Sequence, residues 1–234
     1  MSARYAVYFA PEKLSPWWMF GAHWLGRDEY ESVSLPQPKL DDVSQDELAL
    51  VTAQPRRYGF HATLKAPFRL AEGFDEVALL LRLEALAKTL APVPLGAVQP
   101  KTLSDFVALV PNQVPACLAE LAASCVLGLD DLRAPLSPDD LLKREAHKLD
   151  ARGAELLTLY GYPQVMERFR LHLTLTGPVD TDMANRIERA AATTVAHLNE
   201  AAPLTVDRLC LFVEKTPGAP FLRIADYLLG GIAR

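Results

Sequence analysis

One eight-residue pattern occurs twice in this chain, and it constrains the fold more than any other feature. The first copy, FHATLKAP, covers residues 60–67, and the second, LHLTLTGP, covers residues 171–178. Both read apolar, His, any residue, Thr, Leu, polar, small, Pro, and each precedes a long amphipathic segment. An internal repeat sets the architecture of a chain, so this pattern predicts a duplicated strand-and-helix unit.

Hydrophobic periodicity and turn residues place further elements around the two copies. Strands are expected at residues 4–10, 58–68, 95–98, 106–110, 168–176, 204–214 and 221–229, with a turn at 100–104. Helices are expected at residues 17–25, 46–52, 74–90, 115–126 and 180–199. The order strand, helix, strand, strand therefore occurs twice, which favours an α+β fold with two antiparallel lobes. Lobe one comes mainly from residues 1–126 and lobe two mainly from 164–234, with strands free to swap between them.

A helical connector at residues 127–163 joins the two lobes. The run Ser137-Pro138-Asp139-Asp140 is typical of a helix N-terminus, because a hydroxyl caps it and two acids face the helix dipole. Three connector cations are candidates to reach a second phosphate of a ligand, although a solvated helix face is the favoured interpretation of each one. They are Arg133, Lys143 and Arg144.

Side chains alternate across a strand, so each copy of the pattern should present one polar face and one apolar face. The polar face of the first copy would carry Arg57, Gly59, His61, Thr63 and Lys65. The polar face of the second would carry Arg168, Arg170, His172, Thr174 and Thr176. A single His-x-Thr is ordinary in a strand. Two copies in matched context favour a functional role, because packing gives no reason to keep them on the polar face.

Two histidines and two threonines suit chemistry at phosphate. An imidazole has an unperturbed pKa of about 6.5, so one ring can act as a general base and the other as a general acid. Phosphodiester cleavage needs both roles, and hydroxyl groups nearby can bind phosphoryl oxygens. Further substrate-binding candidates are the cations and polar groups on the same faces or on the first strand. They are Arg57, Lys65, Arg168, Arg170, Thr176 and Tyr8.

Other site chemistries are disfavoured by the sequence. Two histidines can ligate zinc or iron, but neither strand places an acid or a cysteine beside its histidine as a further ligand. Scattered glycines form no phosphate-binding loop, and no nucleophile elbow occurs. We therefore expect a site without metal or cofactor.

The charge balance limits the partners. Lys and Arg number 24 and Asp and Glu number 29, so the formal net charge is 24 − 29 = −5. Binding to RNA is possible but not favoured, because it relies on a broad basic surface. We expect a small cationic cleft for a compact phosphorylated ligand. No apolar run suits a signal peptide or a membrane helix, and three cysteines without a CxxC pair suit a reduced, cytoplasmic protein. The oligomeric state does not follow from the sequence.

The motifs FHATL and LHLTL resemble those of the two-histidine (2H) phosphoesterase superfamily, which includes cyclic nucleotide phosphodiesterases and 2′-5′ RNA ligase-like proteins. The longer strings RYGFHATLKAPF, GYPQVMERFRLHLTLTGP and FVEKTPGAPFLRIADY resemble a branch associated with phosphonate utilisation operons. The resemblance implies a bilobal, pseudo-twofold fold with a central cleft between two antiparallel sheets and helices outside.

The resemblance also implies roles for the repeated residues. His61 and His172 would be the acid–base pair, and Thr63 and Thr174 would bind phosphate oxygens, without a metal. The implied activity is hydrolysis of a cyclic phosphate on a small nucleotide or phosphorylated sugar, in phosphonate metabolism. Two alternatives stay open at this point: a non-catalytic binder of a phosphorylated metabolite, and RNA-end processing of the RNA ligase-like kind.

Overall fold

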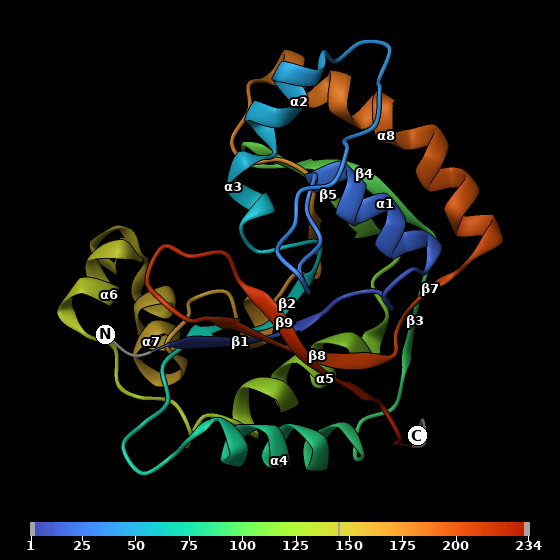
Figure 1. The fold of residues 1–234 in the computed structure, drawn as a ribbon. Coiled ribbons are helices and arrows are strands. Elements are labelled where there is room, and N and C mark those ends of the chain that lie inside the picture. The colour runs from blue at the N-terminus through green and yellow to red at the C-terminus, as the bar shows by residue number, and fades with distance from the viewer. Residues whose placement is uncertain (1–2, 145, 232–234) are drawn as a thin grey trace.

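A computed structural model describes residues 3–144 and 146–231 of the chain. This part is a mixed α+β structure with antiparallel sheets, as predicted (Figure 1). The strands are β1 (Arg4–Phe9), β2 (Ala62–Phe68), β3 (Val93–Gly96), β4 (Val98–Leu103), β5 (Phe106–Pro111), β6 (Leu173–Thr174), β7 (Leu204–Val206), β8 (Arg208–Glu214) and β9 (Leu222–Leu228). The α-helices are α1 (Pro16–Leu25), α2 (Gln45–Val51), α3 (Ala53–Arg56), α4 (Glu76–Ala87), α5 (Ala116–Leu127), α6 (Pro138–Lys143), α7 (Ala151–Tyr160) and α8 (Thr181–Ala201).

Each sheet combines strands from early and late parts of the chain. The largest has the order β2-β1-β8-β9, a second has the order β4-β5-β6, and β3 pairs with β7. The first and last thirds of the chain are therefore interleaved. The strand expected at 204–214 is split at Asp207 into β7 and β8, and these two strands belong to different sheets.

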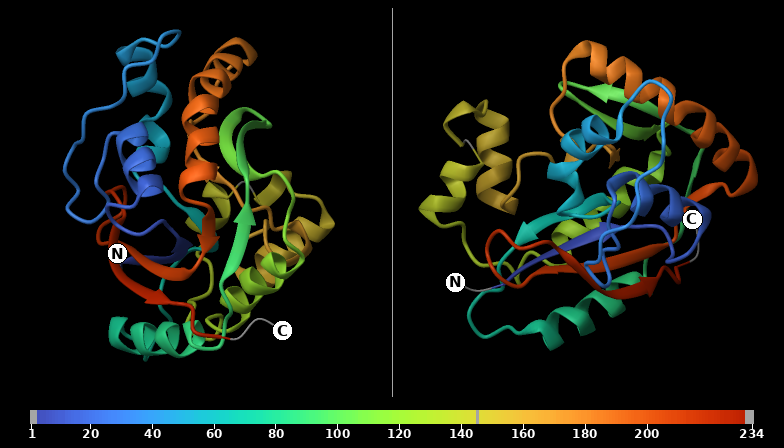
Figure 2. Two further views of the ribbon diagram at one scale, coloured as in Figure 1. Left: turned by 90° about the vertical axis from the view of Figure 1, so that its right-hand side faces the viewer. Right: turned by 45° about the horizontal axis from the view of Figure 1, so that its top comes forward.

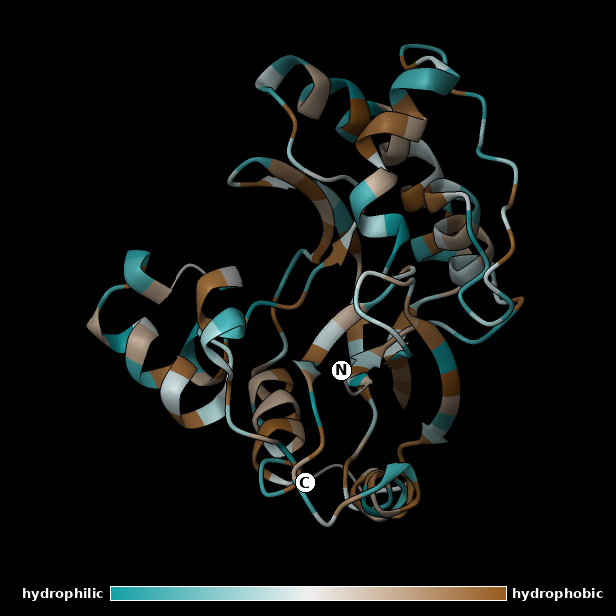
Figure 3. Ribbon diagram, turned by 60° about the vertical axis from the view of Figure 1, so that its left-hand side comes forward, coloured by the Kyte–Doolittle hydropathy of each residue, from teal (hydrophilic) through white to brown (hydrophobic). Residues whose placement is uncertain are grey.

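Helices cover the sheets on their outer faces. α4 runs along one face of the four-stranded sheet, and α8 packs on β4 and β5 (Figures 1 and 2). Hydropathy alternates along the helices, as expected for helices with one buried side (Figure 3). No helix in the described ranges is both long enough and apolar enough to cross a bilayer.

The two faces of β1 have different surroundings. Tyr5, Val7 and Phe9 point into the main core, which they share with Leu79 and Leu83 of α4. Ala6 and Tyr8 belong to a smaller cluster on the opposite face, with Phe212 and Phe221. The alternation of β1 therefore turns Tyr8 away from the main core.

Local sequence signals explain where several helices begin. Ser15 caps α1 by accepting a hydrogen bond from the Trp18 amide (3.2 Å), with Pro16 at the first helical position. Ser137 and Asp140 form a reciprocal capping box at the start of α6, which confirms the helix start predicted there.

Two predicted strands are shorter in the structure. The strand expected at 58–68 begins at Ala62, since the preceding residues form α3 and a turn. The strand expected at 168–176 is reduced to the two residues of β6. A 3-10 helix at Met166–Arg168 precedes it, and after it the amides of Leu175 and Thr176 both donate to the Val107 carbonyl oxygen (2.9 and 3.1 Å) and end the regular ladder. Conversely, β4 extends through most of the expected turn at 100–104.

The substitution Gly21→Ala tests the packing of α1 on the segment before β2. A Cβ atom at Gly21 would lie 2.0 Å from Cγ of Phe60. Alanine usually stabilises a helix interior by up to about 1 kcal/mol over glycine, but overpacking a core costs about 1–3 kcal/mol. We expect the free energy of unfolding in urea to fall by about 2 kcal/mol. A variant as stable as the wild type would contradict this packing.

Candidate functional site

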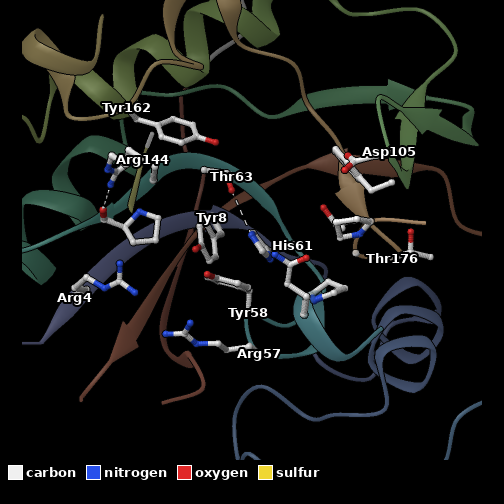
Figure 4. A pocket seen from close by; sticks show the side chains of 18 of the residues that line it. Arg4, Tyr8, Arg57, Tyr58, His61, Thr63, Asp105, Arg144, Tyr162 and Thr176 are labelled. Atoms are coloured by element: carbon white, nitrogen blue, oxygen red, sulfur yellow. Dashed lines mark hydrogen bonds between the residues drawn. The ribbon is translucent and has the colours of Figure 1, made fainter. Parts of the chain in front are cut away.

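A cavity of about 620 Å³ brings the two His-x-Thr copies into one site. Its walls come from β1 and β2, from the turn between β4 and β5, from β6 and the residues after it, and from the connector. Figure 4 shows His61 and Thr63 in the middle of the lining side chains, with Tyr8 beside them. The cavity is thus built from five regions that are far apart in the sequence.

The two histidines make equivalent backbone contacts. Nδ1 of His61 lies 2.8 Å from the Gly59 carbonyl oxygen, and Nδ1 of His172 lies 2.8 Å from that of Arg170. A carbonyl oxygen can only accept, so each Nδ1 donates and the neutral ring keeps its lone pair on Nε2. Nε2 of His61 lies 3.3 Å from Oγ1 of Thr63, the contact dashed in Figure 4.

Burial holds both imidazoles in the neutral form at pH 7. The Tyr8 ring stacks on the His61 ring with centroids 3.7 Å apart. Desolvation lowers the pKa of His61 to about 4. The hydrogen bond to the Gly59 carbonyl oxygen acts in the opposite direction and raises this pKa, whereas repulsion from His172 lowers it further. Burial also lowers the pKa of His172. Both rings are therefore neutral, each with its lone pair on Nε2.

These shifts predict a pH dependence of stability. The unfolded chain protonates its histidines near pH 6.5, whereas the folded protein protonates His61 near pH 4, so the unfolded state binds more protons between these values. The thermal midpoint should therefore fall as the pH falls through this range. The His61→Gln variant should lose part of that slope in melts followed by circular dichroism. Identical slopes for variant and wild type would contradict the depressed pKa.

Six of the predicted site residues line the cavity: Tyr8, Arg57, His61, Thr63, Thr174 and Thr176. Thr176 is fully buried, and its hydroxyl oxygen accepts a hydrogen bond from the Val107 amide (3.0 Å), so it also supports the backbone. Arg57 forms an ion pair with Glu214 and donates to the Ala219 carbonyl oxygen (3.1 Å).

His172 lies beside the cavity rather than in its wall. Its ring centroid is 5.6 Å from that of Phe106, which does line the cavity. Its influence on the pKa of His61 places the two rings within electrostatic reach.

The prediction that Lys65 shares the polar face of His61 and Thr63 is wrong. Thr63 pairs with Tyr8 while Lys65 pairs with Val7, so β2 advances two residues where β1 advances one. This bulge reverses the alternation. Lys65 is buried on the opposite side, where its Nζ donates to the Val126 carbonyl oxygen (3.0 Å) and to Asp130 (3.1 Å).

Arg168 and Arg170 also lie outside the cavity lining, contrary to prediction. Arg168 belongs to a short 3-10 helix and pairs with Asp150 (2.7 Å). Arg170 donates to the carbonyl oxygens of Glu167 and Phe169 (3.2 and 2.8 Å). Because no regular strand extends through this segment, strand alternation does not apply to it.

Among the charged and aromatic lining residues, the sequence did not single out Arg4, Tyr58 or Tyr162. Arg4 was detectable, because strand alternation puts it on the same face of β1 as Tyr8. Arg144 was one of the three connector candidates for a second phosphate, with a solvated helix face as the favoured interpretation, and it lines the cavity. Tyr162 carried no sequence signal. The connector thus contributes to the cavity wall, although the side chain of its Lys143 lies outside the described part.

In the described ranges, no three His, Cys, Asp or Glu side chains come close enough together to hold a metal ion. The polar groups that line the cavity are hydroxyls, the His61 imidazole, guanidinium groups, the Gln54 carboxamide and the carboxylates of Asp105 and Asp140.

Two curated proteins are similar to almost the whole chain. One, from Janthinobacterium sp. (strain Marseille), is 41% identical over 222 residues, which are 94% of this chain and 49% of that protein. Another, from Laribacter hongkongensis (strain HLHK9), is 41% identical over 231 residues, which are 97% of this chain and 53% of that protein. Both are named ribose 1,5-bisphosphate phosphokinase PhnN. The chain spans about half the length of these relatives.

These names correct the expected reaction. A phosphokinase transfers a phosphoryl group to its substrate, whereas a phosphoric diester hydrolase uses water to break a phosphoester bond. The prediction of a metal-independent cyclic phosphodiesterase is therefore wrong, and RNA-end processing has no support from the relatives either. The expectation of a small phosphorylated ligand agrees with what the relatives' names state.

The family match covers residues 63–222, from the threonine of the first copy through the whole of the second. His61 lies just outside the matched range. The match extends over more than half of the chain, and the family is described as a protein of unknown function, DUF1045. The chain therefore belongs to the DUF1045 family.

Proposed function

We propose that this chain provides the site for phosphorylated ribose in a ribose 1,5-bisphosphate phosphokinase reaction. The observation that carries this proposal is the cavity of about 620 Å³, where the threonines of both repeats meet arginine and tyrosine side chains. Pockets for small ligands are of this size and combine apolar walls with a few convergent polar groups. The names of the relatives support ribose bisphosphate as the ligand.

The repeated residues have defined roles in this proposal. The hydroxyls of Thr63 and Thr174 donate hydrogen bonds to phosphoryl oxygens. Nε2 of neutral His61 accepts a hydrogen bond from a sugar hydroxyl, and Tyr8 fixes the plane of the imidazole by stacking on it. His172 acts from the edge of the cavity. The ring and hydroxyl groups thus recognise sugar and phosphate together.

The phosphoryl donor needs a second site. The sequence contains no GxxxxGK[ST] run, the loop that cradles nucleotide phosphates in many phosphotransferases. The chain matches only about half the length of its relatives. We assign the donor site to a segment equivalent to the unmatched half, with which this chain would act.

The proposal also includes a relationship of this chain to the 2H superfamily. Its fold would then consist of two lobes related by a pseudo-twofold axis and joined by the connector at 127–163. The matched Nδ1–carbonyl contacts of His61 and His172 support it, since both are 2.8 Å long and involve the second residue before each histidine. The designation PhnN of the relatives supports a place in phosphonate metabolism.

Calorimetric titration tests the proposal. The chain should bind ribose 5-phosphate and ribose 1,5-bisphosphate, and should release no heat with unphosphorylated ribose. The His197→Ala variant is a matched control, because this histidine is exposed on α8, and it should bind as the wild type does. Absence of binding for both phosphates, or equal binding of ribose, would overturn the proposal.

A further inference from the structure

One end of the cavity holds cationic groups that the His-x-Thr repeats do not explain. We call it the arginine–tyrosine end, and it consists of Arg4, Arg57, Arg144, Tyr58 and Tyr162. In Figure 4, Arg4, Arg144 and Tyr162 lie on one side of Tyr8, whereas Asp105 and Thr176 lie on the far side of His61. Arg4 and Tyr162 each act electrostatically on both Arg144 and Tyr8, so these groups are neighbours in space.

The charges of this end do not cancel. Arg4 and Arg57 share one buried carboxylate, that of Glu214, so these three groups carry 2 − 1 = +1. Arg144 adds another positive charge, and no described carboxylate forms an ion pair with it. Asp140 also lines the cavity, but Arg69 pairs with it. The resulting charge of about +2 matches a phosphate dianion.

Arg144 is held in position while its donors stay available. It follows α6 directly, and its Nη2 donates to the Pro67 carbonyl oxygen (3.0 Å). Its guanidinium carbon lies 5.4 Å from the centre of the Tyr162 ring, within the range of a cation–π contact. A guanidinium group has five N–H donors, so several remain for a ligand.

The tyrosine hydroxyls add neutral donors. In the described part of the chain, the hydroxyl groups of Tyr8, Tyr58 and Tyr162 have no hydrogen-bond partner, although all three side chains line the cavity. These hydroxyls open onto the cavity, so each can donate a hydrogen bond to a ligand bound there.

We propose that the arginine–tyrosine end binds the second phosphate of a bisphosphorylated sugar and makes the site selective for bisphosphates over monophosphates. This inference rests on the proposed function, which places the sugar and its first phosphate at the His-x-Thr repeats. Tyr8 and His61 are stacked between the two ends, and the sugar ring would span them.

The substitutions Arg144→Gln and Tyr162→Phe test this selectivity. Wild-type protein should bind ribose 1,5-bisphosphate at least about tenfold more tightly than ribose 5-phosphate. Arg144→Gln should weaken bisphosphate binding by about ten- to hundredfold and monophosphate binding by less than about threefold; Tyr162→Phe should act in the same direction with a smaller loss. Arg189→Gln, at an exposed position of α8, is the matched control and should change neither affinity. Equal losses for the two ligands in Arg144→Gln would overturn the inference.

Inorganic pyrophosphate separates this inference from the proposed function. Pyrophosphate should bind at the arginine–tyrosine end. Its affinity should fall in the Arg144→Gln variant and stay unchanged in the His61→Ala variant. If pyrophosphate behaves in this way but no ribose phosphate binds, the proposed function fails and the anion site stands. If ribose phosphates bind without preference for the bisphosphate, the inference fails and the proposed function stands.

Discussion

The His61→Ala variant is expected to bind ribose 5-phosphate about ten- to hundredfold more weakly than the wild type. Removing one partner of a buried hydrogen bond costs about 1–3 kcal/mol, and 1.4 kcal/mol corresponds to a tenfold change in affinity. His61 is the histidine in the cavity wall, and its loss removes both the acceptor of the sugar hydroxyl and the ring that stacks on Tyr8. Calorimetric titration at pH 7 measures the change.

The His172→Ala variant should show a smaller loss of about three- to tenfold, because His172 lies beside Phe106 at the edge of the cavity. Both variants should keep the circular dichroism spectrum and the cooperative melt of the wild type. An unchanged affinity in His61→Ala, with the fold intact, would remove this residue from the site.

The Arg223→Met variant should lose about 3–5 kcal/mol of unfolding free energy, because it leaves a buried charge without its partner. The side chains of Arg223 and Glu29 are both fully buried, with Nη1 3.4 Å from Oε1. Arg223 also donates to the carbonyl oxygens of Ala10 (3.3 Å) and Pro11 (2.7 Å), where β1 ends. Urea unfolding followed by fluorescence measures the loss.

Arg82→Met provides the matched control for this prediction. Arg82 pairs with Asp131 at 3.1 Å, but both side chains are about half exposed (45% and 53%). Exposed ion pairs contribute only about 0–1 kcal/mol, so the control should unfold nearly as the wild type does. Equal losses in the two variants would contradict the difference in burial between these ion pairs.

Local patterns predicted the elements that depend on local interactions. Periodicity placed α4, α5 and α8 within a few residues of their observed bounds, because an amphipathic stripe defines a helix locally, and α8 also has the Asp180 cap at its start. The His-x-Thr repeat likewise predicted that the threonines of both copies would share a site. Thr63 and Thr174 do line the same cavity.

Non-local interactions account for the residues that were misplaced. The bulge in β2 turns Lys65 to the opposite face, and it is visible only in the pairing with β1. The ladder of β6 ends early because one carbonyl of β5 accepts two amides. Arg144 and Tyr162 enter the cavity because the connector folds against it, which strand and helix periods do not encode.

The reaction was harder to predict than the ligand class, for a chemical reason. Imidazole, hydroxyl and guanidinium groups recognise phosphate whatever attacks or leaves the phosphorus atom. The repeat therefore predicted a phosphorylated ligand, whereas the choice between water and a phosphoryl donor depends on a second site. The names of the relatives favour phosphoryl transfer.

The most direct test of the central claim is a crystal structure of the chain with ribose 1,5-bisphosphate bound. We expect one phosphate within hydrogen-bond distance of the Thr63 and Thr174 hydroxyls and the other at Arg144. A ligand bound outside this cavity, or one whose phosphates contact neither threonine, would contradict the proposed site.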